Sequence, residues 1–313
     1  MRTAFIDALF DLAAEDVRVH LVVGDLGFSV VDKFAQAYPD RFLNAGVAEQ
    51  NMTGIAAGIA LNGGVVFTYS IANFSTLRCL EQIRNDVCYH RANVKVVSVG
   101  GGLAYGNLGV THHATEDLAI MRSLPGMVVE APGDPVEARL ATRALIARDG
   151  PAYLRLGKAG EALVQESDPE YKIGKAITLR EGGDVAILST GGMLRTAVDV
   201  ADRLASQGIG ARVLSMHSVS PLDIKAVEAA AADTRSIVTL EEHGVVGGLG
   251  GAVAEVLAEL PPGHAPLKRI GLAPEFISVV GDQEYLRKVH GLDEESVLKT
   301  IQKFVGKSIG ILR

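Results

Sequence analysis

Short apolar stretches alternate with helical segments along the first half of the chain, and this alternation constrains the fold more than any other feature. The predicted strands are residues 20–23, 65–68, 94–99, 127–130 and 152–155. The helices predicted between them are residues 48–61, 76–90 and 134–147. Such alternation is typical of β/α units on a mainly parallel sheet. Right-handed crossovers would then bring the strand ends and their loops to one edge of the sheet.

The alternation is interrupted between residues 157 and 183, where acidic residues and Pro169 lie close together. A second series follows, with strands predicted at residues 185–189, 211–216, 236–240 and 267–270, and helices at 194–206, 222–231 and 249–260. The sequence therefore predicts an α/β protein of two β/α domains, each with a mainly parallel sheet. We place the first domain at residues 1–165, a linker at 166–179 and the second domain at 180–313.

Composition excludes several classes of protein. A chain of 313 residues with 48% hydrophobic and 21% charged residues can bury a large core. A formal charge of −7 without a basic stripe argues against a nucleic-acid partner. Cys79 and Cys88 are too few for a disulfide framework and lack the spacing of a zinc site. No apolar run reaches the roughly 20 residues that span a bilayer. We therefore expect a cytoplasmic protein with no membrane partner.

One acidic residue, Glu49, stands after a glycine turn at Gly46 and at the start of a helix of small and apolar side chains. A carboxyl group that enters a core is costly unless it has a partner or a task. Residues 53–61, which continue the helix, offer no positive charge. A solvated position in the first turn, favoured by the helix dipole, is the alternative. Otherwise something outside this segment must use the carboxylate.

The run Gly-Val-Ala-Glu-Gln at residues 46–50, together with later segments, resembles the pyrimidine-binding half of thiamine-diphosphate enzymes. The resemblance is strongest to transketolases and to 1-deoxyxylulose-5-phosphate synthases, and it covers the whole chain. It implies a pyrimidine-binding domain followed by a domain of the transketolase C-terminal type. It also implies that Glu49 is catalytic and hydrogen-bonds N1′ of the aminopyrimidine of thiamine diphosphate.

The loop that follows the strand at residues 65–68 carries an aromatic ring that stacks on the cofactor in the families that this chain resembles. Phe74 is our candidate for that ring, because a flat heterocycle gains contact area and orientation against a phenyl face. Packing at the edge of the sheet is the alternative for Phe74. Tyr69 is a second cofactor-binding candidate, whose hydroxyl would reach water or substrate.

Five glycines precede a Thr-His pair in residues 100–112, which favours a loop whose backbone approaches a ligand closely. We expect neither His112 nor the adjacent His113 to be a buried packing residue. By resemblance, His112 contacts the substrate and helps to move protons, while His113 replaces a glutamine of the family motif. Gly100 and Leu108 replace a histidine and an aspartate that contact the sugar in transketolases. The substrate can therefore differ from the usual sugar-phosphate donor.

Two further residues are candidates for binding an anionic group of the substrate. Arg155 resembles the family arginine that binds a substrate phosphate, and its guanidinium suits bidentate contact with phosphate or carboxylate. An ordinary surface arginine is an equal alternative. Ser29 is a weaker candidate for the same anion.

A glycine-rich turn at residues 241–251 joins a predicted strand to a predicted helix in the second domain. Exposed backbone N–H groups at such a turn attract anions. The turn lacks both the Lys-Ser/Thr ending of a nucleotide loop and the G-x-G-x-x-G register. We therefore favour close packing of strand and helix over phosphate binding.

The family motif for the diphosphate and Mg²⁺, Gly-Asp-Gly followed by Asn, is missing. Residues 133–135 and 281–283 begin with Gly-Asp but lack the third glycine. The resemblance then implies a split enzyme, in which the diphosphate and the metal are held through oxygen ligands on a separate partner chain. Gly54 and Gly58 would permit close helix approach at that interface, or else internal packing. We expect a two-fold assembly of both subunit types, a heterotetramer.

These features together predict a subunit of a split transketolase that transfers a two-carbon ketol unit between sugar phosphates. The closest alternative is the β subunit of a 2-oxo-acid dehydrogenase E1 component, which has the same domain order and also needs a partner chain. A non-catalytic assembly subunit is a third hypothesis, favoured by Gly100 and Leu108 but opposed by Glu49, Phe74 and His112 together.

Overall fold

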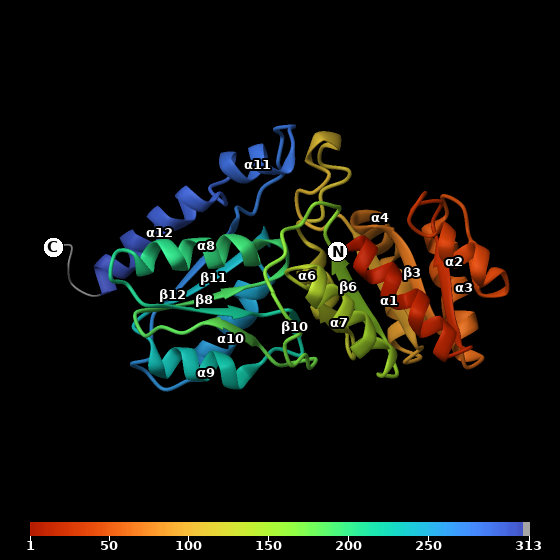
Figure 1. Cartoon of the computed structure of the whole chain (residues 1–313), viewed down its shortest axis with the longest axis horizontal. Helices are drawn as coiled ribbons and strands as arrows, with labels where there is room; N and C mark the ends of the chain where they lie inside the picture. The colour runs from red at the N-terminus through yellow and green to blue at the C-terminus, as the bar shows by residue number, and fades with distance from the viewer. Residues whose placement is uncertain (309–313) are drawn as a thin grey trace.

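The computed structural model describes residues 1–308, which form two α/β lobes side by side (Figure 1). Residues 309–313, at the end of the predicted second domain, lie outside the described residues. The N-terminus lies near the junction of the lobes, and α12 (Glu294–Ser308) lies at the far end of the second lobe (Figure 1).

The first lobe is built on a seven-stranded sheet within residues 1–308, in the order β10-β5-β6-β4-β3-β1-β2. Its strands are β1 (Val19–Val23), β2 (Phe42–Asn44), β3 (Val65–Ile71), β4 (Val94–Val99), β5 (Val128–Glu130), β6 (Ala152–Leu156) and β10 (Ser218–Ser220). All neighbours pair in parallel except β10 and β5. The carboxyl ends of β1, β3 and β4 therefore meet at one edge.

Helices cover both faces of this sheet. α1 (Arg2–Glu15) and α7 (Pro135–Ile146) pack together on one face, over the inward side chains Val97 and Val99. On the other face, α3 (Glu49–Leu61) and residues 72–88 cover Val96 and its neighbours. Successive strand residues thus alternate between two apolar layers, as the pleat requires. The first lobe also contains the shorter helices α2 (Asp32–Ala37), α4 (Ala72–Thr76), α5 (Leu80–Gln82) and α6 (Asp117–Arg122).

The helix predicted at residues 76–90 is wrong as a continuous element. The chain instead forms α4, a 3₁₀ turn at Leu77–Cys79, α5 and a π-helical turn at Ile83–Cys88. The hydroxyls of Ser75 and Thr76 donate to the carbonyls of Ile71 and Ala72. Such back-bonding competes with regular helix and bends it. From the 3₁₀ turn, the side chain of Arg78 reaches Glu49 at the start of α3.

The second lobe is built on a five-stranded sheet within the described residues, in the order β12-β11-β8-β9-β7. Its strands are β7 (Ile177–Arg180), β8 (Val185–Ser189), β9 (Ala211–Ser215), β11 (Ile237–Gly244) and β12 (Leu267–Leu272), and β7 alone among them is antiparallel. α8 (Leu194–Ala205) and α12 cover one face, α9 (Ile224–Asp233) and α10 (Leu249–Glu259) the other; α11 (Gln283–Val289) precedes α12. The predicted α/β class with two mainly parallel sheets is confirmed.

Residues 157–176 connect the two sheets, so the limits 1–165 and 180–313 remain a prediction. One short strand crosses the division, because β10 follows β9 in sequence but pairs with β5 of the first sheet. Its place is held by polar side chains: Oγ of Ser218 lies 2.5 Å from Glu130, and His217 lies 3.1 Å from the same carboxylate. No sequence pattern indicates β10, because three residues with two serines carry no strand periodicity.

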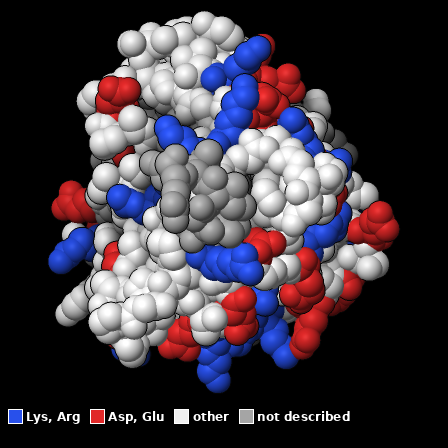
Figure 2. Space-filling view, turned by 90° about the vertical axis from the view of Figure 1, so that its left-hand side faces the viewer, with Lys and Arg blue, Asp and Glu red and all other residues white. Residues whose placement is uncertain are grey.

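Acidic and basic side chains alternate over the end of the molecule formed by the second lobe, and no single-sign field covers that face (Figure 2). Among the described residues, no helix has both the length and the apolar character needed to cross a bilayer.

Candidate functional site

Glu49 is the first residue of α3 and is buried, with 1% of its surface exposed. The turn before it depends on Gly46, whose φ of 75° favours glycine. Oε2 of Glu49 accepts a hydrogen bond from Nη1 of Arg78 at 2.7 Å, and Oε1 accepts one from Oγ of Ser70 at 3.3 Å. The alternative of a solvated first-turn residue is therefore wrong. As expected, groups outside the segment use the carboxylate, but the sequence did not identify Arg78.

The carboxylate is also enclosed by Gly24, the residue after β1. A Cβ at Gly24 would lie 3.2 Å from Cγ of Glu49 and 3.3 Å from Oγ of Ser70. Both distances are tighter than ordinary van der Waals contacts. The space that Glu49 occupies at the edge of the sheet thus depends on the missing side chain of Gly24.

Phe74, on α4, is linked to Glu49 through Arg78. The Cζ atom of Arg78 stands 4.5 Å from the centre of the Phe74 ring, a cation–π contact. On another side of Phe74, the ring of His112 makes an edge contact with a centroid distance of 5.0 Å. Nδ2 of Asn73 donates to the carbonyl of Thr111 at 2.8 Å, which ties α4 to the His112 loop. Glu49, Phe74, His112 and Arg78 therefore form one cluster.

Tyr69 does not belong to this cluster, and its predicted contact with cofactor or substrate is wrong. The side chain is fully buried and stacks on Phe5 of α1, on the opposite face of β3 from Glu49. Burial raises the pKa of Tyr69 to about 12, so it stays protonated. Because side chains alternate along a strand, the next residue, Ser70, reaches Glu49 instead.

The glycines at residues 100–102 serve close packing, within the first lobe at Gly100 and Gly101 and against the second lobe at Gly102. Cβ atoms there would collide with Tyr105, Arg155 and Glu242 respectively. Approach of this backbone to a ligand stays a prediction. The expectation for His113 is wrong, since it is 4% exposed and burial lowers its pKa. His112, by contrast, is half-buried.

Arg155 is a buried cross-link between the lobes. Its Nε lies 2.8 Å from Oδ2 of Asp117, and Nη2 donates to the carbonyls of Ala114 and Glu242 at 2.9 and 3.0 Å. Burial opposes the charge, but the Asp117 carboxylate outweighs it and raises the pKa of Arg155. The surface alternative is wrong, because the residue is 5% exposed. Nε and Nη2 thus have partners, whereas no hydrogen bond joins Nη1 to a group within residues 1–308, so phosphate binding by Arg155 stays a prediction.

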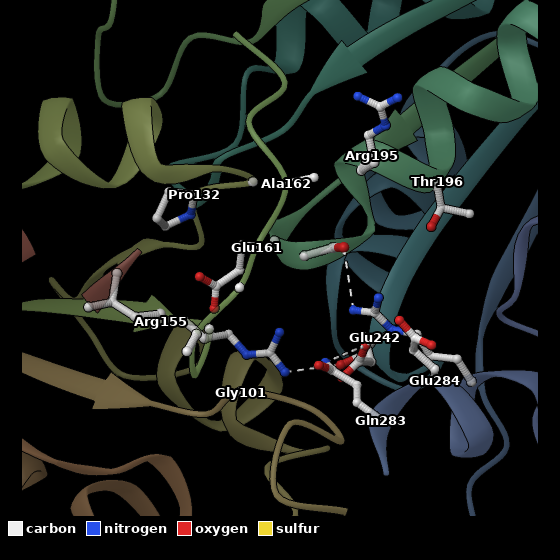
Figure 3. A pocket seen from close by; sticks show the side chains of 18 residues that line it. Gly101, Pro132, Arg155, Glu161, Ala162, Arg195, Thr196, Glu242, Gln283 and Glu284 are labelled. Carbon is white, nitrogen blue, oxygen red and sulfur yellow. Dashed lines mark hydrogen bonds and ion pairs between the residues drawn. The ribbon is translucent and has the colours of Figure 1, made fainter. Parts of the chain in front are cut away.

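Arg155 does border a polar cavity of about 340 Å³ at the junction of the lobes (Figure 3). The carboxylate of Glu242 accepts hydrogen bonds there from Gln283 and from Arg287. Neither Glu49, Phe74 nor His112 lines this cavity. This cavity and the Glu49 cluster thus lie apart.

Ser29, the weaker anion candidate, is exposed in the loop before α2, with φ at 63°. Its backbone N–H already bonds the carboxylate of Asp32 at 3.0 Å. A carboxylate so close disfavours a second anion, so this geometry does not support the predicted role.

The glycine-rich turn of the second lobe serves packing, as expected. Glu241 accepts hydrogen bonds from the N–H groups of Leu249 and Gly250, at 2.7 and 2.8 Å. The chain's own carboxylate thus takes the place of an anion at the start of α10. The two incomplete Gly-Asp motifs are helix caps: Asp134 caps α7 and Asp282 caps α11. Within residues 1–308 no group of His, Cys, Asp and Glu is arranged to hold a metal ion.

Sequence reasoning missed Arg78, Ser70 and Gly24. The parity of β3 could have identified Ser70, because residues 68 and 70 share the face opposite Tyr69. No sequence signal points to Arg78, which is 29 positions from Glu49 and follows the irregular turn.

The two-lobed α/β fold, with a buried glutamate near the carboxyl edge of the first sheet, is the architecture that the resemblance to thiamine-diphosphate enzymes implied. Family models agree: residues 1–160 match the pyrimidine-binding domain of transketolase, and residues 174–297 match the transketolase C-terminal domain. The chain belongs to the transketolase family.

Two relatives are named transketolase subunits and are of similar length. The 6-deoxy-6-sulfo-D-fructose transketolase subunit SqwH of a Clostridium species is 41% identical, over 96% of this chain and 92% of the relative. An apulose-4-phosphate transketolase subunit of Phocaeicola vulgatus is 40% identical, over 98% of this chain and 97% of the relative. A solved structure described as a split-gene transketolase, inactive β4 tetramer, is 38% identical with a TM-score of 0.89, covering 96% of this chain and 97% of that one.

Proposed function

We propose that this chain is the pyrimidine-binding subunit of a split transketolase that uses thiamine diphosphate. The observation that carries the proposal is that one planar cation, Arg78, contacts both the buried carboxylate of Glu49 and the ring face of Phe74. Because the planar guanidinium of Arg78 already fits against both groups, another planar group with N–H donors could also fit there. The similarity in length to two transketolase subunits agrees with a divided enzyme.

The residues of this chain would orient the cofactor and control protons. Thiamine diphosphate, when bound, supplies the nucleophilic carbon and the electron sink for transfer of a ketol unit. Glu49 would share a proton with N1′ of the aminopyrimidine, and Phe74 would hold the ring by its face. His112, on the neighbouring loop, would hydrogen-bond the sugar and move a proton at its hydroxyl oxygen. The enclosed position of Glu49 keeps water from its carboxylate.

A partner subunit would hold the diphosphate and Mg²⁺. Asp134 and Asp282, the aspartates of the incomplete motifs, are engaged as helix caps, which supports a metal site outside this chain. Cβ atoms at Gly54 and Gly58 on α3 would meet open space, so internal packing does not explain these glycines. Their exposed face would receive another helix in a two-fold assembly of both subunit types.

The two relatives are named for a sulfonated ketose and a phosphorylated ketose. We infer an anionic ketose as donor for this chain, with Gly100 and Leu108 altering the usual sugar contacts. The β subunit of a 2-oxo-acid dehydrogenase is the second hypothesis, and it predicts activity on pyruvate with a lipoyl acceptor instead.

Co-expression with a diphosphate-binding partner is expected to give a stable complex, with turnover that depends on added thiamine diphosphate and Mg²⁺. The isolated chain is expected to be inactive, since it lacks the diphosphate site. Light scattering of the co-purified pair measures the assembly, and assays with a ketose phosphate plus an aldehyde measure the reaction. A non-catalytic assembly subunit would leave the partner equally active without this chain, and that result would overturn the proposal.

Gly24→Ala is expected to lower kcat/KM of the complex about tenfold, because the added methyl group displaces Glu49 by a few tenths of an ångström from its productive position. The matched control is Gly251→Ala on α10, where a Cβ meets open space. Steady-state kinetics of both variants, with circular dichroism to confirm the fold, make the comparison. Wild-type kinetics in Gly24→Ala would show that this contact does not position Glu49.

A further inference from the structure

The Arg78 guanidinium makes two contacts that rarely coincide on a surface arginine. Nη1 donates to the buried carboxylate of Glu49 at 2.7 Å, while Cζ stands 4.5 Å above the centre of the Phe74 ring. The side chain is nevertheless 43% exposed, whereas that of Glu49 is 2% exposed. A cation has thus entered from the solvent side to reach an enclosed acid and a ring face at once.

These contacts use the same two features that the proposed function assigns to the aminopyrimidine. A guanidinium is flat, carries N–H donors in its plane and stacks on aromatic faces. An aminopyrimidine bound to Glu49 and Phe74 would likewise hydrogen-bond through its edge and stack through its face. The guanidinium of Arg78 and the aminopyrimidine cannot both occupy the same face of Phe74 and the same oxygen of Glu49 at one time.

We propose that Arg78 is an internal substitute for the cofactor heterocycle: it fills the pyrimidine position in the cofactor-free chain and turns outward when the cofactor binds. This inference rests on the proposed function. A buried carboxylate without a partner is costly, so the cofactor-free protein needs a counter-charge for Glu49. Arg78 supplies it, and the guanidinium can return to water because its side chain is already partly exposed.

The irregular segment that carries Arg78 suits such a movement. Leu77–Cys79 is a single 3₁₀ turn between two short helices, and Arg78 is exposed within it. Phe74 belongs to α4, which is tied to the His112 loop through Asn73. The arginine can therefore leave while the ring stays in place.

Competition between Arg78 and the cofactor would weaken cofactor binding. Only molecules in which Arg78 is turned outward would bind the cofactor. The apparent Kd then equals the intrinsic Kd divided by the fraction of such molecules. Removing the guanidinium should therefore tighten binding, about tenfold if one molecule in about ten is open. A residue that contacted the cofactor, or that only stabilised the fold, would not produce tighter binding on removal.

The test compares Arg78→Met with Arg84→Met in the two-subunit complex. Methionine keeps an unbranched apolar stem but removes the planar cation. Arg84 is the matched control, because it is exposed on the same segment and its guanidinium contacts Asn85. Isothermal titration with thiamine diphosphate and Mg²⁺ gives Kd, and inorganic pyrophosphate serves as a ligand that lacks the ring.

We expect Arg78→Met to lower the thermal midpoint of the cofactor-free complex and to bind thiamine diphosphate about tenfold more tightly. Pyrophosphate binding should not change, and Arg84→Met should match the wild type throughout. Equal or weaker binding of thiamine diphosphate by Arg78→Met overturns the inference. The wild-type complex is titrated with thiamine diphosphate first. If it does not bind thiamine diphosphate, the proposed function is overturned rather than this inference.

A second measurement does not depend on any variant. In a crystal structure of the wild-type complex with thiamine diphosphate, Nη1 of Arg78 should lie beyond hydrogen-bond distance of Glu49, with the aminopyrimidine against Phe74. An arginine still at 2.7 Å from the carboxylate in that structure would refute the exchange.

Discussion

Glu49→Gln is expected to lower kcat of the two-subunit complex by about 10²- to 10⁴-fold, the usual contribution of a positioned acid–base group. Glutamine has nearly the same shape: its oxygen can accept from Arg78 in place of Oε2, and its amide NH₂, in place of Oε1, can donate to the hydroxyl of Ser70. It has no carboxyl proton to share with N1′ of the aminopyrimidine. Because the buried contacts survive, the fold should be retained, and the loss should appear in kcat rather than in the yield of folded protein.

The control for this variant is Glu81→Gln on α5, an exposed glutamate close in sequence to the site. Its kcat is expected to equal that of the wild type. Steady-state kinetics under saturating thiamine diphosphate, with a urea titration of each variant, separate lost chemistry from lost folding. Undiminished activity of Glu49→Gln would remove the catalytic role from this residue.

Asp117→Ala is expected to have the largest effect on stability, a loss of about 3–5 kcal/mol in the free energy of unfolding. The change leaves the Arg155 guanidinium buried without its carboxylate, and a buried uncompensated charge is strongly destabilising. It also removes the acceptor of the Tyr153 hydroxyl, which lies 2.6 Å from Oδ2 of Asp117. Urea unfolding of the wild type and the variant measures the difference.

Two comparisons isolate the buried charge as the cause. Asp199→Ala removes the carboxylate of an exposed ion pair with Arg195, and should cost only about 0–1 kcal/mol. The double change Asp117→Leu with Arg155→Leu removes both charges and should recover much of the loss, since apolar replacement of a buried pair is often neutral. If Asp117→Ala costs no more than Asp199→Ala, the cross-link between the lobes does not depend on this pair.

The site divides into parts that the sequence predicted and parts that it did not. The turn at Gly46 and the start of α3 follow from local residue patterns and are present in the structure, whereas the burial of Glu49 was one of two alternatives that the local pattern left open. Phe74 was selected by resemblance and is linked to Glu49 through Arg78, although its cofactor contact stays a prediction. Tyr69 was misplaced because the pleat of β3, which alternates two faces, was not applied to the strand end.

Arg155 shows a different limit of sequence reasoning. Its position at the end of β6 was located correctly, but an arginine in sequence is equally compatible with a ligand, with solvent or with a buried partner. The decision came from Asp117 and from the Glu242 carbonyl, which are 38 and 87 positions away. No local pattern encodes contacts at that separation.

The sequence by itself determined the α/β class, the order of the two sheets and the position of the acid, because strand and helix periodicity and a glycine turn are local properties. Tertiary structure alone decided which groups surround that acid. Arg78 reaches Glu49 from the 3₁₀ turn that interrupts the expected helix, at the edge where the carboxyl ends of the parallel strands converge. Packing of distant segments, rather than neighbouring residues, sets the partners of a buried charge.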